Sequence, residues 1–214
     1  DIDFQFKDFT SVIPANTWRT INGQTYYYQN YAKQKNNWIQ DDGAWYYMNG
    51  DGLVSKGWLN QSGKSYYLDD TTGKMITGWK SDSGKWYYFG SSGALSKGWI
   101  NDNGTWYYSN QDGVMQTGWL DDGGERYYLK GSGAMATGWR EMDGAWYYFE
   151  GSGRMAKGVI DVGGLHYYMD PSTGRMAAGT TVDIGGVAYT ADGNGVLSQV
   201  AQEAGNETGD SQTG

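Results

Sequence analysis

Hydrophobic positions along the chain recur with a period of about 20 residues, and most of them are aromatic rather than aliphatic. Most periods open on a Gly-Trp step, pass through a polar turn that ends in Gly, and reach an aromatic run such as Trp106-Tyr107-Tyr108. A second polar turn, such as Gln111-Asp112-Gly113, leads to the next Gly-Trp step. Self-similarity at a fixed short period is typical of repeat architectures.

The residue in the Gly-Trp position, here called the anchor, defines about nine repeats. The anchors are Trp18, Trp38, Trp58, Trp79, Trp99, Trp119, Trp139, Val159 and Thr180. The outermost repeats lose part of the aromatic pattern, as expected of the atypical repeats that cap an array.

Each repeat predicts a β-hairpin followed by a second turn. Pairs such as Asn103-Gly104 suit the positive φ angles of a two-residue hairpin turn. Side chains alternate between the faces of a strand, which places Trp106 and Tyr108 on one face and Tyr107 on the other. One hairpin cannot bury its apolar face alone, so the sequence predicts an all-β solenoid of stacked hairpins.

An apolar residue stands four positions before most anchors. These residues are Val54, Met75, Leu95, Met115, Met135, Met155 and Met176. Their regular spacing predicts a buried aliphatic ladder, or a floor beneath the aromatic rings.

The two ends of the chain depart from the repeat. Ile2, Phe4 and Phe6 alternate with polar residues and predict a capping strand. We therefore expect an N-terminal cap segment at residues 1–17, a repeat solenoid at 18–198 and a flexible tail at 199–214, where large apolar residues are almost absent.

Charge and composition exclude several classes of partner. The net charge is −8 and the 16 Lys and Arg residues are scattered, which disfavours nucleic acid and anionic membrane surfaces. Cysteine is absent and no apolar run is long enough for a membrane span. We expect no nucleic-acid partner and no membrane insertion.

The 11 Trp and 19 Tyr residues are more than packing requires. Cores are more commonly filled by Leu, Val and Ile, and a thin array of hairpins cannot bury every Trp. A repeated, partly exposed aromatic set predicts a repeated ligand site. Ring faces attract a quaternary ammonium ion such as choline, and sugars stack on the same rings. Spacing alone leaves choline, sugar and pure packing open.

The segment TGWKSDSGKWYYFGSSGALSKGW, residues 77–99, resembles the choline-binding repeat of streptococcal and phage cell-wall proteins. The resemblance covers residues 18–190. It implies a superhelical solenoid of β-hairpins that docks on the phosphocholine of teichoic and lipoteichoic acids, outside the cell at the bacterial surface. Glucan-binding repeats and clostridial toxin repeats share the Tyr-Tyr core, so they remain the carbohydrate-binding alternative. They usually lack the Trp pair, which favours the choline-binding repeat.

The resemblance also implies the site residues, because a family site takes two Trp of one repeat and a Tyr of the next. Four complete sets follow: Trp38, Trp45 and Tyr67; Trp79, Trp86 and Tyr108; Trp99, Trp106 and Tyr128; and Trp139, Trp146 and Tyr168. For the first set we expect Val54, and not Met75, at the junction between the hairpins.

Other junctions lack one or both Trp. Thr25, Ser65 and Arg126 replace the second Trp after Trp18, Trp58 and Trp119, and Arg126 puts a positive charge where a cation would bind. We expect these junctions to be structural or weak. Val159 and His166 replace both Trp, so that junction is expected not to bind.

No motif marks an enzyme. His166 is the single His and stands in an aromatic position, and the Asp pairs stand in predicted turns. We expect a non-catalytic module with no cofactor and no metal site. A homodimer, a host protein partner and a purely structural solenoid that binds a protein partner are left open.

Overall fold

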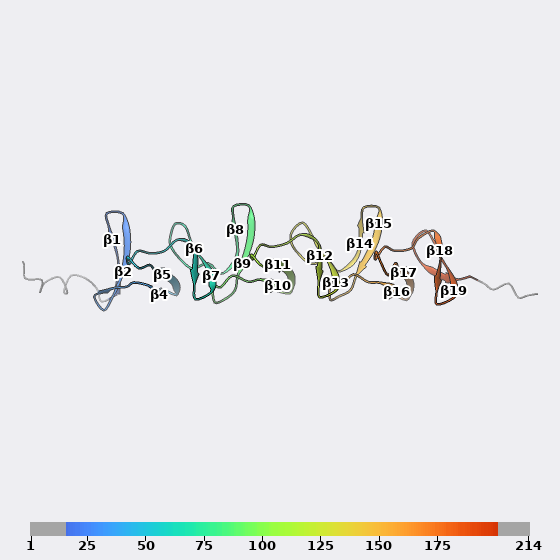
Figure 1. Ribbon diagram of the computed structural model, residues 1–214, viewed down its shortest axis with the longest axis horizontal. Coiled ribbons are helices and arrows are strands. Elements are labelled where there is room, and N and C mark those ends of the chain that lie inside the picture. The colour runs from blue at the N-terminus through green and yellow to red at the C-terminus, as the bar shows by residue number, and fades with distance from the viewer. Residues whose placement is uncertain (1–15, 201–214) are drawn as a thin grey trace, which may run out of the picture. The chain divides into compact units, whose positions relative to one another are not determined.

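The computed structural model describes residues 16–200, which form β-strands and turns without a helix (Figure 1). The chain divides into two compact units, residues 1–116 and 117–214. Within the described range, no helix is long and apolar enough to cross a membrane. The predicted capping strand at Ile2 to Phe6 and most of the predicted tail lie outside the described residues.

The strands of the first unit follow one another as hairpins. They are β1 (Asn16–Ile21), β2 (Gln24–Gln29), β3 (Ala32–Lys33), β4 (Asn37–Asp41), β5 (Ala44–Met48), β6 (Gly57–Gln61), β7 (Lys64–Leu68), β8 (Gly78–Asp82), β9 (Lys85–Phe89), β10 (Gly98–Asp102) and β11 (Thr105–Ser109). The antiparallel pairs are β1–β2, β2–β3, β4–β5, β6–β7, β8–β9 and β10–β11.

The second unit has the same organisation. Its strands are β12 (Gly118–Asp122), β13 (Glu125–Leu129), β14 (Gly138–Met142), β15 (Ala145–Phe149), β16 (Gly158–Val162), β17 (Leu165–Met169), β18 (Thr180–Ile184), β19 (Val187–Ala191) and β20 (Leu197–Gln199). They pair as β12–β13, β14–β15, β16–β17 and β18–β19–β20. The predicted all-β fold of repeated hairpins is confirmed.

The hairpin turns have the geometry that their sequences predict. In the turn between β10 and β11, Asn103 and Gly104 both have positive φ, 50° and 87°. Two successive residues in this region form the turn whose twist matches that of the flanking strands. The Asn-Gly and Asp-Gly pairs therefore fix the length and register of the hairpins.

Consecutive hairpins are tied together by the residue four positions before each anchor, here called the junction residue. Met75 forms a bridge with Leu68 of the preceding strand, and its N–H donates to the carbonyl of Trp45 one hairpin earlier at 2.8 Å. In the second unit, Met176 bridges to Met169 and donates to the carbonyl of Trp146 at 2.8 Å. Met75 and Met176 therefore each hold two hairpins in fixed positions.

In each unit the core contains the residues that follow the Tyr-Tyr pairs. These side chains are fully buried: Met48, Leu68, Phe89, Ser109, Leu129, Phe149 and Met169. Leu68 illustrates why, because it lies between Gly57 on one side and the bridge to Met75 on the other.

The predicted buried ladder is corrected by this finding. Of the seven junction residues, Met155 is buried and the other six are partly exposed. Met75 and Met176 each bond to the backbone of an earlier hairpin, and the side chain of each lines an open cavity. Met75 and Met176 therefore form the floor that was the alternative prediction.

Candidate functional site

An aromatic cavity lies between consecutive hairpins of the first unit. Its volume is about 310 Å³, and its lining is Trp38, Trp45, Tyr66, Met75, Ser91 and Ser92. The two Trp come from the hairpin β4–β5, Tyr66 comes from β7, and the two Ser come from the turn after β9. Three consecutive hairpins thus contribute to one cavity.

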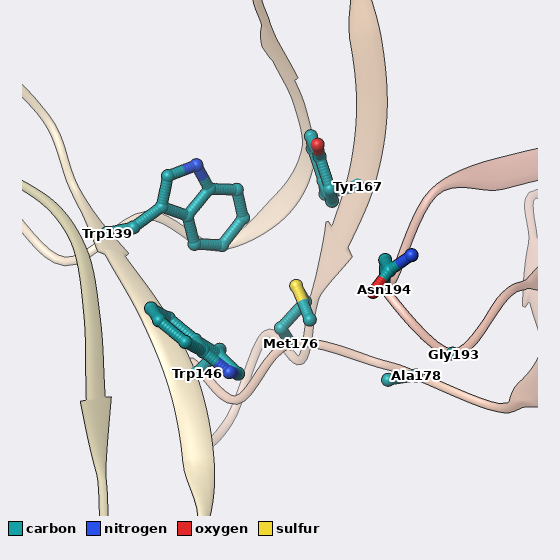
Figure 2. A pocket seen from close by; sticks show the side chains of 7 residues that line it. All are labelled: Trp139, Trp146, Tyr167, Met176, Ala178, Gly193 and Asn194. Atoms are coloured by element: carbon teal, nitrogen blue, oxygen red, sulfur yellow. The ribbon is translucent and has the colours of Figure 1, made fainter.

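A second cavity, in the second unit, repeats this arrangement (Figure 2). Its volume is about 360 Å³, and its lining is Trp139, Trp146, Tyr167, Met176, Ala178, Gly193 and Asn194. Figure 2 shows the rings of Trp139, Trp146 and Tyr167 around one space, with the Met176 side chain at its base.

The register of the hairpin brings the two Trp together. Trp139 lies opposite Tyr148, and Trp146 lies opposite Glu141, two residues beyond Trp139 on the same face of β14. The two indole rings are 6.4 Å apart between centroids and meet at 81°. The second Trp of each complete set remains 41–47% exposed, so the rings form a wall open to solvent.

The tyrosine of each cavity is the first of the Tyr-Tyr pair, not the second as predicted. The ring of Tyr66 is 4.9 Å from that of Trp38, and the ring of Tyr167 is 4.8 Å from that of Trp139. In the set of Trp79 and Trp86, Tyr107 is 4.8 Å from Trp79.

The predicted tyrosines lie on the other face of the strand. Tyr67 is 4% exposed and packs against Trp58 of its own hairpin, with ring centroids 5.3 Å apart. Its hydroxyl donates to Asp70 at 2.8 Å, and this hydrogen bond, with burial, raises the pKa of Tyr67 to about 12. Tyr108 packs against Trp99 in the same way, at 5.2 Å, and Tyr168 pairs with Val159.

Strand alternation explains this correction and could have prevented it. Trp106 and Tyr108 share one face of β11, and Trp99 of the same hairpin lies on that face too. Tyr107 lies on the opposite face, which is turned toward the preceding hairpin. The set of Trp99, Trp106 and Tyr128 draws on both units and stays a prediction. Within their own units, Trp99 and Trp106 are 6.5 Å apart, and Tyr128 packs against Trp119 at 5.3 Å.

The junction residue of the first set is Met75, which corrects the expectation of Val54. The N–H of Val54 donates to the carbonyl of Thr25 at 3.0 Å, so Val54 belongs to the junction of Trp18. The segment that follows a hairpin contacts the hairpin before it: Met75 follows β6–β7 and contacts β4–β5. The junction residue of an anchor is therefore found about 37 residues after it rather than about 16, as Trp38 and Met75 illustrate.

Carboxylates of the following hairpin orient several anchors. The indole N–H of Trp79 donates to Asp102 at 3.0 Å, and Trp58 and Trp18 donate to Asp82 at 3.1 Å and to Asp41 at 2.9 Å. The sequence alone predicts a solvated turn for Asp41 and no role for Asp82 and Asp102. Each of these three Asp residues ends the first strand of its own hairpin. This regular position was the signal that could have predicted their contacts with the Trp anchors.

Where the second Trp is missing, its replacement contacts the residue directly opposite on the partner strand. The four pairs are Thr25 with Thr20 at 3.3 Å, Ser65 with Asn60 at 2.7 Å, Arg126 with Asp121 at 3.0 Å, and His166 with Asp161 at 3.4 Å. These side chains are held by their own hairpin and do not complete a cage.

The junction of Trp119 is further changed by a cation of the chain itself. The guanidinium of Arg126 lies over the Trp119 ring, 5.0 Å from its centroid, and Asp121 holds it there. A cation over a Trp face is a favourable arrangement that a ligand cation would have to displace.

Comparison with known repeats agrees with this geometry. The choline-binding repeat matches residues 76–108, 96–138 and 136–181, and the putative cell wall binding repeat matches residues 36–53 and 56–75. The chain belongs to the choline-binding repeat family. The matched ranges contain the lining of both cavities except for the turn of Asn194. The lining of the first cavity is divided between the two repeat types, because Ser91 and Ser92 lie in a choline-binding repeat and the other four residues in putative cell wall binding repeats.

Solved structures of choline-binding proteins from Streptococcus pneumoniae share the fold. CbpJ is 41% identical with a TM-score of 0.74, and CbpF, crystallised in the presence of a peptidoglycan analogue, is 43% identical with a TM-score of 0.71. Each match covers 82% of this chain and 62% of the other. The choline-binding domain of CbpL is 31% identical with a TM-score of 0.68, over 86% of this chain and 98% of that domain.

The chain spans less than two thirds of the length of CbpJ and of CbpF. A comparison with curated proteins gives no match. The choline-binding repeats thus establish the family and the architecture.

Proposed function

We propose that this chain is a non-catalytic module that anchors to phosphocholine on teichoic and lipoteichoic acids of the bacterial cell wall. The observation that carries the proposal is the pair of open cavities walled by two Trp and one Tyr, without a charged side chain in their lining. Such a site suits a cation that cannot form hydrogen bonds, and quaternary ammonium is that kind of cation.

The cages are assigned from the contacts described above. We propose Trp38, Trp45 and Tyr66 with Met75 as one cage, and Trp139, Trp146 and Tyr167 with Met176 as another. Trp79 and Trp86 with Tyr107 form a third by the same contact.

The strength of one cage is modest. A ring face contributes roughly 0.5 to 2 kcal/mol to holding a cation. Three rings therefore give on the order of 4 kcal/mol, which corresponds to about millimolar affinity. Several such sites that meet a polymer with many phosphocholine groups gain affinity through effective concentration. The proposed attachment is therefore avid, and free choline at high concentration should release it.

Two anchors in the first unit provide a matched test. Trp38 lies 5.3 Å and 4.9 Å from its two Tyr rings, and Trp58 lies 5.3 Å and 4.8 Å from its two, but only Trp38 has a second Trp beside it. Choline is titrated against Trp38→Ala and Trp58→Ala, followed by tryptophan fluorescence, with stoichiometry from calorimetry. Trp38→Ala should lose one site and Trp58→Ala none.

Further arms separate binding from folding and choline from sugar. Trp45→Ala removes an exposed wall of the same cage and should lose the same site with little change in stability. Equal losses from Trp38→Ala and Trp58→Ala would contradict the cage assignment. Silence of the wild-type chain to choline and tetramethylammonium, with a response to dextran, would replace the proposal by carbohydrate binding.

A further inference from the structure

Both cavities extend past the aromatic cage to a polar rim that a third hairpin supplies. In the first unit the rim is Ser91 and Ser92, in the turn after β9. In the second unit it is Asn194, in the turn between β19 and β20. Figure 2 shows Asn194 on the separate loop beyond Tyr167 and Met176, on the side of the cavity away from the two Trp rings.

The cavities are larger than the cation that the rings would hold. A trimethylammonium group has four non-hydrogen atoms, and at about 30 Å³ for each water-sized atom it fills on the order of 120 Å³. The two cavities measure about 310 and 360 Å³. Each therefore has room for the next atoms of the ligand beside the rim.

The rim offers neutral hydrogen-bonding groups. The backbone N–H groups of Asn194 and Val196 donate to the Asp192 carboxylate at 2.8 and 2.9 Å, which fixes the turn. Within residues 16–200 no hydrogen bond engages the side-chain amide of Asn194. Ser92 accepts a long hydrogen bond from the N–H of Ala94, at 3.4 Å, and its hydroxyl proton stays free to donate.

We propose that this rim donates hydrogen bonds to the oxygen atom that follows the two-carbon arm of a choline-type ligand. The inference rests on the proposed function, because the cage must first hold the quaternary ammonium. The oxygen is a hydroxyl in choline and a phosphate ester oxygen in phosphocholine, and both accept hydrogen bonds from Ser and Asn side chains.

The rim also gives a function to the last hairpin. β18–β19–β20 has Thr181 and Ala188 where the register of β14–β15 places Trp139 and Trp146, so it has no cage of its own. The predicted anchor Thr180 is corrected by one residue, because it pairs with Ala191 as Gly138 pairs with Phe149. Its turn at Asn194 nevertheless closes the cavity of Trp139 and Trp146. A complete site therefore consists of a Trp pair, a Tyr and a rim from three consecutive hairpins.

The test isolates the two cages whose rims are known. In a Trp86→Ala/Trp106→Ala background the remaining complete Trp pairs are Trp38–Trp45 and Trp139–Trp146. Onto it are added Ser91→Ala, Ser92→Ala and Asn194→Ala together. The control is Gln111→Ala. Gln111 occupies the same position in its turn as Ser91 does in its own, but its turn packs on Leu95, at the junction of Trp58, which has no complete Trp pair.

Four ligands are titrated by calorimetry: tetramethylammonium, propyltrimethylammonium, choline and phosphocholine. The triple rim variant should bind choline and phosphocholine roughly 2- to 10-fold more weakly, the loss expected of a hydrogen bond. Tetramethylammonium and propyltrimethylammonium, which lack the oxygen, should bind it unchanged, and Gln111→Ala should match the background for all four. A larger loss for phosphocholine than for choline would identify the phosphate as the recognised group, and equal losses the shared oxygen position.

Two results would overturn the inference. Unchanged binding of all four ligands, or an equal loss for all four, would show that the rim does not recognise the oxygen. If the background chain binds none of the four although circular dichroism shows it folded, the proposed function fails as well. The two failures are thus distinguishable.

Discussion

The guanidinium of Arg126 lies over the ring of Trp119, 5.0 Å from its centroid, and extends from the position that a second Trp occupies in complete cages. Asp121 on the opposite strand holds it at 3.0 Å. The junction thus contains its own cation. The sequence predicts both a lost wall and a positive charge at the cation position, and the structure places that charge over the Trp119 ring.

Replacing this occupant should create a binding site. Arg126→Trp restores the Trp pair next to Tyr147, whose ring is 5.2 Å from Trp119, above Met155. We expect the choline stoichiometry measured by calorimetry to rise by one. Arg126→Ala, which removes the cation but adds no wall, should leave the stoichiometry unchanged. No gain from a folded Arg126→Trp variant would contradict the view that the second Trp is the missing part.

The turn at Gly93 should affect binding through Met75. Gly93 has φ +79°, and a Cβ there would collide with the Met75 side chain, whereas Gly84 has φ +77° with nothing within 4 Å. Gly93→Ala and Gly84→Ala should each cost about 1 kcal/mol or more of stability, because left-handed backbone disfavours Ala. Choline titration should show weaker binding only for Gly93→Ala. Equal effects of both variants on binding would mean that Met75 does not shape the cavity.

Alkaline pH should weaken the packing of Tyr67. Its pKa is raised to about 12 by the hydrogen bond to Asp70, above the ordinary value of about 10. A raised pKa contributes stability in full below pH 10 and loses it as pH rises from 10 to 12. Urea unfolding at pH 9, 10 and 11 should therefore show a steeper decline for the wild type than for Tyr67→Phe. Parallel declines would show that the hydrogen bond does not control this titration.

The buried hydroxyl of Ser109 should reduce stability. Ser109 is fully buried in the core of the first unit, and within the described residues its Oγ has no hydrogen-bond partner. Ser109→Ala removes an unsatisfied buried group, so we expect a gain of about 1 kcal/mol and a higher Tm. Ser81→Ala, at an exposed strand position, serves as the control and should change the Tm little. A lower Tm for Ser109→Ala would indicate that the hydroxyl has a partner such as bound water.

The fold follows from local features of the sequence. The 20-residue period, the Asn103-Gly104 type of turn and the aromatic runs each act within one hairpin, so reading them in order predicts the strands. The pairing of Trp139 with Trp146 on one face is likewise local, because both belong to one hairpin whose register the turn fixes. Strand alternation also predicts that Tyr66, and not Tyr67, lines the cavity of Trp38. The alternation has to be followed along the neighbouring hairpin, which contributes the Tyr, to reach this prediction.

Other parts of the site depend on how one hairpin is placed on the next. Met75 meets Trp45 thirty residues away, and the turns of Ser92 and Asn194 reach cavities that begin two hairpins earlier. Period and composition are the same whether a turn covers the adjacent hairpin or the one before it. The sequence by itself determined the hairpins and the Trp pairs, because these are set within a few residues. Only the tertiary structure decided the floor and the rim of each cavity, because stacking between hairpins brings them together.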